Sequence, residues 1–169
     1  MGRADGQAVT QNPNYNTAGW VARMSPAERG AIWRNAIEAF ARLGAIDWQA
    51  DGFQFLARAE WGRPGLDQYL GHIEAWYHGC RKGRQMPYVD AAIAYIRDRQ
   101  PAGVPVNVLW GDSTPSNVMF RDDGSVSALI DWELAALGPS ELDLAWWLYF
   151  DDLFSRRFGV ARLEGLPTR

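Results

Sequence analysis

The sequence predicts an α+β fold that is mostly helical and contains a small β-hairpin sheet. Apolar residues recur at helical spacing through most of the first hundred residues and again after residue 140. Between these stretches lie short β-branched and aromatic segments separated by turn residues. A chain of 169 residues, 47% of them hydrophobic, can bury one core. We therefore expect a single domain or one lobe of a larger protein.

The first helix is predicted to begin at Pro26. Ser25 suits the N-cap, Pro26 suits the first helical position, and Glu28 completes a capping box. Gly44 offers a C-terminal stop. The apolar residues that recur at helical spacing in between are Ile32, Trp33, Ala36, Ile37, Phe40 and Leu43. Residues 1–19 are rich in Gly, Asn and Gln without any period, so we expect an extended linker there.

Three more helices are predicted. One runs over roughly 66–80 and a second over roughly 89–99, each with one apolar face. The apolar positions are Tyr69, Leu70, Ile73, Trp76 and Tyr77 in the former and Ala92, Ile93 and Ile96 in the latter. The third follows "GPSELD", and its adjacent Trp146 and Trp147 predict a buried helix packed under the sheet.

Strands are predicted between the third and the last helix. The segments 106–110, 117–120 and 125–130 are short and β-branched, and "RDDG" between the last two has the composition of a hairpin turn. Polar residues stand at the ends of these strands. The sheet therefore offers loops in which polar side chains can gather.

Composition excludes several classes of function. The net charge of −3 comes from 20 acidic and 17 basic residues that are interspersed, so we expect no nucleic-acid partner and no membrane partner. No apolar run reaches transmembrane length, and residues 1–20 lack the apolar centre of a signal peptide. The single cysteine, Cys80, excludes an internal disulfide and favours a reducing compartment. We expect a cytoplasmic protein.

Four polar residues that follow the predicted strands are candidates for a functional site: Asp112, Asn117, Asp131 and Asp143. Asp112 and Asn117 have the spacing of the kinase catalytic loop, in which the Asp orients a hydroxyl nucleophile and the Asn binds Mg²⁺. Asp131 follows the hairpin, where a second metal ligand is needed. One carboxylate and one amide oxygen suit Mg²⁺, which keeps several waters.

These segments resemble the aminoglycoside phosphotransferase-like, or choline-kinase-like, small-molecule kinases, a branch of the protein-kinase-like fold. The resemblance rests on "VLWGDSTPSNVMF" and "ALIDWELAALGPSELDLAWWL", and more weakly on "SPAERGAIWRNAIEAFARLGAID". It implies that Asp112 is the catalytic base, that Asn117 and Asp131 bind Mg²⁺ and thereby the nucleotide, and that Asp143 supports the catalytic loop. It also implies ATP or GTP as co-substrate and a small-molecule hydroxyl as acceptor.

The sequence departs from this family in two places. Trp110 stands where His is common. No Gly-rich phosphate loop is present, and Lys82, the single lysine, lies between predicted helices rather than on a strand. The resemblance therefore covers a C-terminal lobe only, with residues 1–20 as the post-hinge linker and 21–169 as the lobe. We expect the amino-terminal nucleotide lobe and the terminal helices to be missing and the isolated chain to be inactive.

Two other functions stay open. A kinase-like lobe without its phosphate lysine could act as a non-catalytic binding module. "GDS" at 111–113 resembles the nucleophile motif of a serine esterase family, but His72 and His78 both precede it, whereas that family places its His near the carboxyl end. Glu133 is open between metal contact and solvent, and a homodimer through apolar residues around 104–109 is a further expectation.

Overall fold

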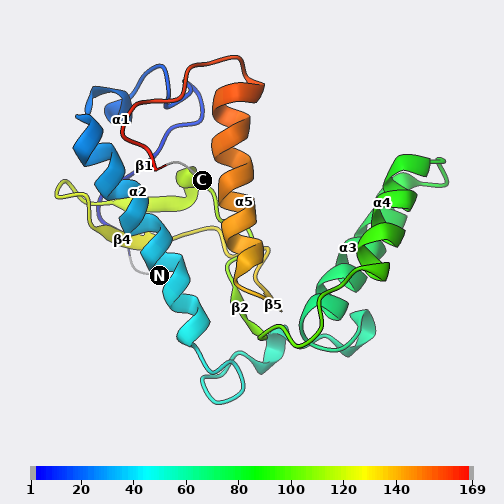
Figure 1. Ribbon diagram of the computed structural model, residues 1–169. Helices are drawn as coiled ribbons and strands as arrows, with labels where there is room; N and C mark the ends of the chain where they lie inside the picture. Colours follow the sequence, from blue (N-terminus) through cyan, green and yellow to red (C-terminus); the bar gives the residue numbers. More distant parts are fainter. Residues whose placement is uncertain (1–2, 168–169) are drawn as a thin grey trace. The chain divides into compact units, whose positions relative to one another are not determined.

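The computed structural model describes residues 3–167, which divide into two compact units (Figure 1). The first unit comprises Met1–Leu43, Trp110–Leu134 and Glu141–Arg169. The second comprises Gly44–Leu109 and Ala135–Ser140. Each unit has its own helices and its own small antiparallel sheet.

The sheet of the first unit has three strands in the order β1-β3-β4, and all of its pairs are antiparallel. The strands are β1 (Gln7–Ala8), β3 (Val118–Phe120) and β4 (Val126–Leu129). The predicted hairpin turn is confirmed, because the Gly124 N–H donates to the Arg121 carbonyl at 2.9 Å between β3 and β4. Val118 pairs with Leu129, which fixes the end of the hairpin nearest Asn117.

Helix α2 (Pro26–Ala41) has the predicted amino-terminal cap. The Ser25 hydroxyl accepts from the Glu28 N–H at 3.3 Å, and the Glu28 carboxylate accepts from the Ser25 N–H at 2.7 Å. These two bonds satisfy donors that the first turn of a helix leaves unpaired. The helix ends earlier than predicted and passes into a 3₁₀ turn, η1 (Arg42–Ala45), which contains Gly44.

The prediction that residues 1–19 contain no element was wrong for the described part of that segment. Strand β1 pairs with β3, and a four-residue helical turn, α1 (Trp20–Arg23), follows the segment. Tyr15 is buried, and the Asn16 side-chain amide donates to the Phe154 carbonyl. Partners more than a hundred residues away therefore order this polar segment. The predictions for residues 1, 2, 168 and 169 lie outside the described residues.

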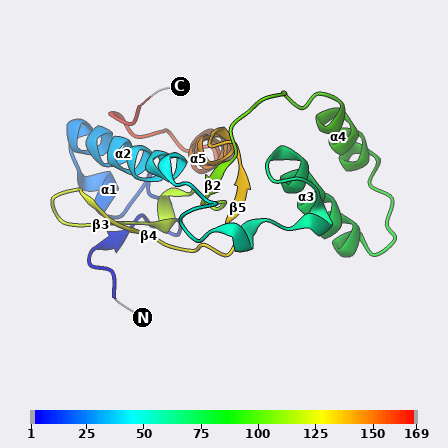
Figure 2. The same cartoon turned by 90° about the horizontal axis from the view of Figure 1, so that it is seen from below.

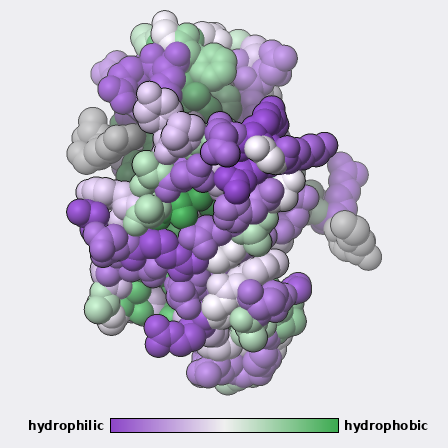
Figure 3. Space-filling model, turned by 90° about the vertical axis from the view of Figure 1, so that its right-hand side faces the viewer, coloured by the Kyte–Doolittle hydropathy of each residue, from purple (hydrophilic) through white to green (hydrophobic). Residues whose placement is uncertain are grey.

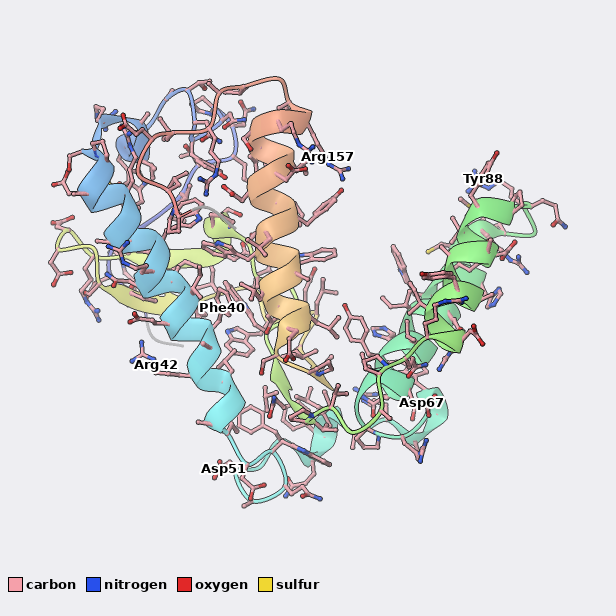
Figure 4. The ribbon with its side chains drawn as sticks, in the orientation of Figure 1. Phe40, Arg42, Asp51, Asp67, Tyr88 and Arg157 are labelled. Atoms are coloured by element: carbon pink, nitrogen blue, oxygen red, sulfur yellow. The ribbon has the colours of Figure 1, made fainter. Side chains whose placement is uncertain are left out.

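Aromatic side chains from α2 and α5 (Glu141–Asp152) fill the core of the first unit. The ring centroids of Trp33 and Trp147 lie 5.2 Å apart, and Phe40 packs on Trp147 at 5.6 Å. Helix α2 packs against α5 through these rings and also covers the sheet (Figure 2). Figure 4 shows Phe40 on the side of α2 that is turned to α5. A π-helical turn, η5 (Leu153–Arg157), follows α5.

The second unit contains α3 (Leu66–Arg81) and α4 (Pro87–Asp98), both confirmed to within three residues of their predicted bounds. Two short 3₁₀ turns, η2 (Gln54–Leu56) and η3 (Ala59–Trp61), precede α3. Its sheet pairs β2 (Asn107–Leu109) with β5 (Ala136–Gly138), a strand that the sequence did not predict. Arg97 of α4 binds Glu74 of α3 through two hydrogen bonds of 2.8 and 2.7 Å.

The predicted apolar faces of α3 and α4 are only partly buried. Leu70 and Tyr77 are buried, whereas Trp76 is 66% exposed and Ile96 48% exposed. Tyr88, at the start of α4, projects into solvent (Figure 4). Figure 3 shows hydrophobic residues exposed between hydrophilic ones on one face of the molecule. Helical spacing thus located these helices but not the extent of their burial.

Replacing Ser25 with Ala is expected to lower the free energy of unfolding by about 1 kcal/mol, the typical cost of losing a helix N-cap. Urea denaturation of the wild type and the variant measures this difference. Glu28→Gln is the matched control, because Gln still accepts from the Ser25 N–H in the capping box. Equal losses in both variants would mean that the Ser25 hydroxyl does not stabilise α2.

Candidate active site

Asp112, in the loop from Trp110 to Asn117, accepts hydrogen bonds at both oxygens of its carboxylate. The Asn117 Nδ2 donates to Asp112 Oδ2 at 2.8 Å and to the Asp112 backbone carbonyl at 3.1 Å. The Trp146 Nε1 of α5 donates to Asp112 Oδ1 at 2.9 Å. Asp112 remains half-buried, so a small molecule can still reach it. The structure thus brings the side chains of the predicted Asp and Asn into direct hydrogen-bond contact.

Gly111 allows this loop to pass close to the segment after β4. Its φ of 90° lies in the left-handed region, and a Cβ there would stand 2.1 Å from the Leu134 carbonyl oxygen. Only glycine meets both demands without displacement. The Trp110 ring adds a second link, since its Nε1 donates to the Ile130 carbonyl at 2.8 Å.

Asp131 lies directly after β4, at the same end of the hairpin as Asn117. The Ile130 N–H donates to the Asn117 carbonyl at 2.9 Å, which continues the ladder between β3 and β4 by one pair. Asp131 has a φ of 62°, a left-handed conformation that Asp tolerates better than most residues. Its side chain is exposed. Strained backbone of this kind gathers at functional sites.

Asp143 is 3% exposed and binds the backbone of the loop that carries Asp112. Its carboxylate accepts from the Trp110 N–H at 2.8 Å and from the Gly111 N–H at 2.9 Å. Its own carbonyl accepts from the Ser113 hydroxyl at 2.7 Å. Three hydrogen bonds therefore attach the first turn of α5 to residues 110–113.

Burial raises the pKa of Asp143 above its ordinary value of 3.8, while the hydrogen bonds from Gly111 and Trp110 oppose the shift. The folded protein therefore binds this proton more tightly than the unfolded chain does. The contribution of this group to stability decreases as the pH rises from 3.8 through the raised pKa.

Asn117 and Asp131 offer oxygen donors of the kind that Mg²⁺ prefers. Asn117 uses Nδ2 for both of its side-chain bonds to Asp112, which leaves Oδ1 for a cation. Asp131 adds an exposed carboxylate. Within residues 3–167 no group of three or more His, Cys, Asp or Glu side chains is arranged to hold a metal. One carboxylate and one amide fit Mg²⁺, which takes its remaining ligands from water and substrate phosphates.

Trp146 is the site residue that the sequence interpretation missed. It was predicted to be buried with Trp147, but only Trp147 is buried; Trp146 is 36% exposed and bonds to Asp112. Neighbouring residues on a helix point about 100° apart, so the pair cannot share one environment. This rotation between neighbouring helical residues could have indicated from the sequence that Trp146 and Trp147 face different surroundings.

The structure also shows the surroundings of the other residues for which the sequence suggested a role. Ser113 is fully buried and donates to Asp143, so its hydroxyl cannot attack a substrate as an esterase nucleophile would. Glu133 is exposed. His72 stacks on Trp61 with centroids 4.1 Å apart, a packing role. Val108 and Leu109 are buried, which removes the centre of the surface predicted for a homodimer.

A sequence profile decides the family. The profile of the phosphotransferase enzyme family matches residues 6–169, nearly the whole chain. The chain belongs to this family. Among the described residues of the chain, no helix is both long enough and apolar enough to span a membrane.

Solved structures show the fold of this chain. A protein assigned as an aminoglycoside phosphotransferase, from Ralstonia eutropha JMP134, superposes with a TM-score of 0.64 at 20% identity, covering 96% of this chain and 55% of that chain. An aminoglycoside-3'-phosphotransferase of type VIII gives a TM-score of 0.55 at 20% identity, covering 89% and 51%. The predicted α+β, kinase-like fold is confirmed.

Curated relatives match over a similar stretch. The protein named Probable acyl-CoA dehydrogenase IBR3, from Arabidopsis thaliana, is 27% identical over 134 residues, which cover 73% of this chain and 16% of that protein. Acyl-CoA dehydrogenase family member 10, from Mus musculus, is 24% identical over 126 residues, which cover 73% and 11%. The chain thus spans a small part of these relatives and about half of the solved chains.

Proposed function

We propose that this phosphotransferase moves the γ-phosphoryl group of ATP or GTP to a hydroxyl of a small molecule with the help of Mg²⁺. The observation that carries the proposal is the Asp112 carboxylate, which is held through both oxygens and is still accessible. Phosphoryl transfer asks a protein mainly to position the reactants and to stabilise charge. A fixed carboxylate that is bonded to Asn117, one of the two proposed metal ligands, supports that chemistry.

Asp112 would accept the hydrogen bond of the acceptor hydroxyl and orient its oxygen toward the phosphoryl group. As that oxygen bonds to the γ-phosphorus, the bond from this phosphorus to the β–γ bridging oxygen breaks, ADP or GDP leaves with the bonding electrons, and the hydroxyl proton passes to the carboxylate. Asn117 Oδ1 and Asp131 would hold Mg²⁺, which neutralises the charge of the nucleotide phosphates when bound. Asp143 keeps the loop in place through its bonds to Trp110 and Gly111.

The acceptor belongs to one of three chemical classes. Sugars and choline-like amino alcohols are proposed from the family resemblance. A hydroxyacyl thioester is proposed with them, because both curated relatives are named acyl-CoA dehydrogenases. A panel with one compound from each class, assayed for phosphate ester formation, separates them.

The 169 residues contain no Gly-rich phosphate loop, and Lys82 lies at the carboxyl end of α3 in a left-handed conformation. We therefore propose residues 1–20 as a post-hinge linker, 21–169 as a C-terminal lobe, and little turnover by these residues alone. The alternative is a non-catalytic binding module. A cytoplasmic location is part of the proposal, since the single cysteine is a free thiol.

Asp131→Asn is expected to weaken Mg·ATP binding at least tenfold, because an amide loses the charge that attracts the cation. Calorimetric titration of the chain, and of a form extended upstream in its gene, measures the affinity. Asp122→Asn is the matched control, because Asp122 is exposed in the turn of the same hairpin. Equal affinities in the two variants would argue against a metal at Asp131, and an extended form that binds no nucleotide would favour the binding module.

A further inference from the structure

Whereas Trp147 is buried in the core, its neighbour Trp146 is hydrogen-bonded to Asp112. Its indole N–H donates to Asp112 Oδ1 at 2.9 Å, and the ring stays partly exposed. We propose that Trp146 is a positioning residue, which fixes the plane of the Asp112 carboxylate and gives the acceptor an apolar wall beside it. This inference rests on the proposed function and deepens it.

Two donors on two oxygens determine the orientation of the carboxylate. Asn117 holds Oδ2 from the same loop, and Trp146 holds Oδ1 from α5. A carboxylate with one bond can still turn about its Cβ–Cγ axis, whereas donors from two directions stop that rotation. A carboxylate has about four acceptor sites, so these two bonds leave room for the acceptor hydroxyl.

Both donors are neutral, which preserves the negative charge of Asp112. No Arg, Lys or His forms an ion pair with Asp112 among the described residues. Asp152 on the same helix shows the contrast, because Arg156 and Arg157 both bind its carboxylate. A cation at Asp112 would compete with the acceptor hydroxyl. An indole N–H orients the group without that competition.

The packing around Trp146 keeps its ring in place. The ring lies 5.4 Å from Phe150 and 6.1 Å from Tyr149, one turn further along α5. The first turn of α5 is itself bonded to the Asp112 loop through Asp143. The exposed part of the Trp146 ring can contact the C–H groups that flank the acceptor hydroxyl. Such a contact favours an acceptor with a hydrocarbon segment next to the hydroxyl.

Two measurements test the inference. The first follows the nine indole N–H signals of the chain by NMR and assigns Trp146 by its loss in Trp146→Phe. Asp112→Asn is expected to move the Trp146 signal and to speed its hydrogen exchange, leaving the other eight nearly unchanged. An unmoved Trp146 signal would overturn the contact, with or without any enzymatic activity.

The second measurement is steady-state kinetics in the upstream-extended form. Trp146→Phe keeps an aromatic ring but loses the donor, and it is expected to lower kcat about tenfold with an unchanged KM for nucleotide. Trp76→Phe, an exposed tryptophan of α3, is the control and should change neither. A Trp146→Phe variant with the kcat of the wild type would overturn the positioning role of Trp146 and leave the proposed function intact. An inactive wild-type enzyme would overturn the proposed function and, with it, the positioning role.

Discussion

Asp112→Asn is expected to lower the turnover of the upstream-extended phosphotransferase by roughly 10²- to 10⁴-fold, the range that a positioned acid–base group contributes. The amide cannot take the hydroxyl proton, and it carries no charge to attract the acceptor. Its shape is nearly the same, so we expect the loop to keep its fold, although one of the two donors, Asn117 or Trp146, loses its acceptor oxygen. We expect an unchanged KM for nucleotide, because the proposed mechanism gives Asp112 a contact with the acceptor hydroxyl and none with the phosphates.

Steady-state kinetics with both substrates measures this effect, and a thermal melt of each protein excludes a folding defect. Asp122→Asn, in the exposed turn between β3 and β4, is the control and should keep full activity. A variant at Asp112 that retains a tenth or more of the wild-type turnover would mean that another group accepts the proton.

Asp143→Ala is expected to give the largest loss of stability of any substitution at the site, about 3 kcal/mol or more. It leaves the buried N–H group of Trp110 and the partly buried N–H group of Gly111 without an acceptor, and a buried unpaired donor costs roughly 1–3 kcal/mol. The loop that holds Asp112 would also lose its attachment to α5. Activity should therefore fall together with stability.

Urea denaturation at neutral pH measures the change in the free energy of unfolding. Glu141→Ala is the matched control, because Glu141 is an exposed acid in the same first turn of α5 and has no bond to the loop. We expect less than about 0.5 kcal/mol for it, as for most surface substitutions. Similar losses in the two variants would show that the Asp143 hydrogen bonds do not hold the loop.

Local signals in the sequence predicted the elements that carry the site. The capping box of Ser25 and Glu28 fixed the start of α2, and the turn composition at 121–124 fixed the β3–β4 hairpin. Both depend on residues within a few positions of each other. The spacing of Asp112 and Asn117 is likewise local, and the structure bonds the two side chains directly.

Contacts between residues far apart in the chain could not be predicted from the sequence. Strand β1 is two residues long and exists because β3 lies beside it, 111 residues later in the chain at the Ala8–Met119 pair. Arg29 is buried because three backbone carbonyls, of Val21, Ala22 and Glu164, accept from its guanidinium. Trp146 was assigned to the core for the same reason: its partner, Asp112, is 34 residues away. Only the fold brings such partners together.

The most direct test of the proposed function is phosphorus NMR of the product formed when γ-labelled ATP or GTP and the acceptor panel are mixed with the upstream-extended phosphotransferase and Mg²⁺. The proposed function predicts a new phosphate ester on one acceptor with the wild type and none with Asp112→Asn. No ester from either nucleotide, or equal ester from both proteins, would contradict it.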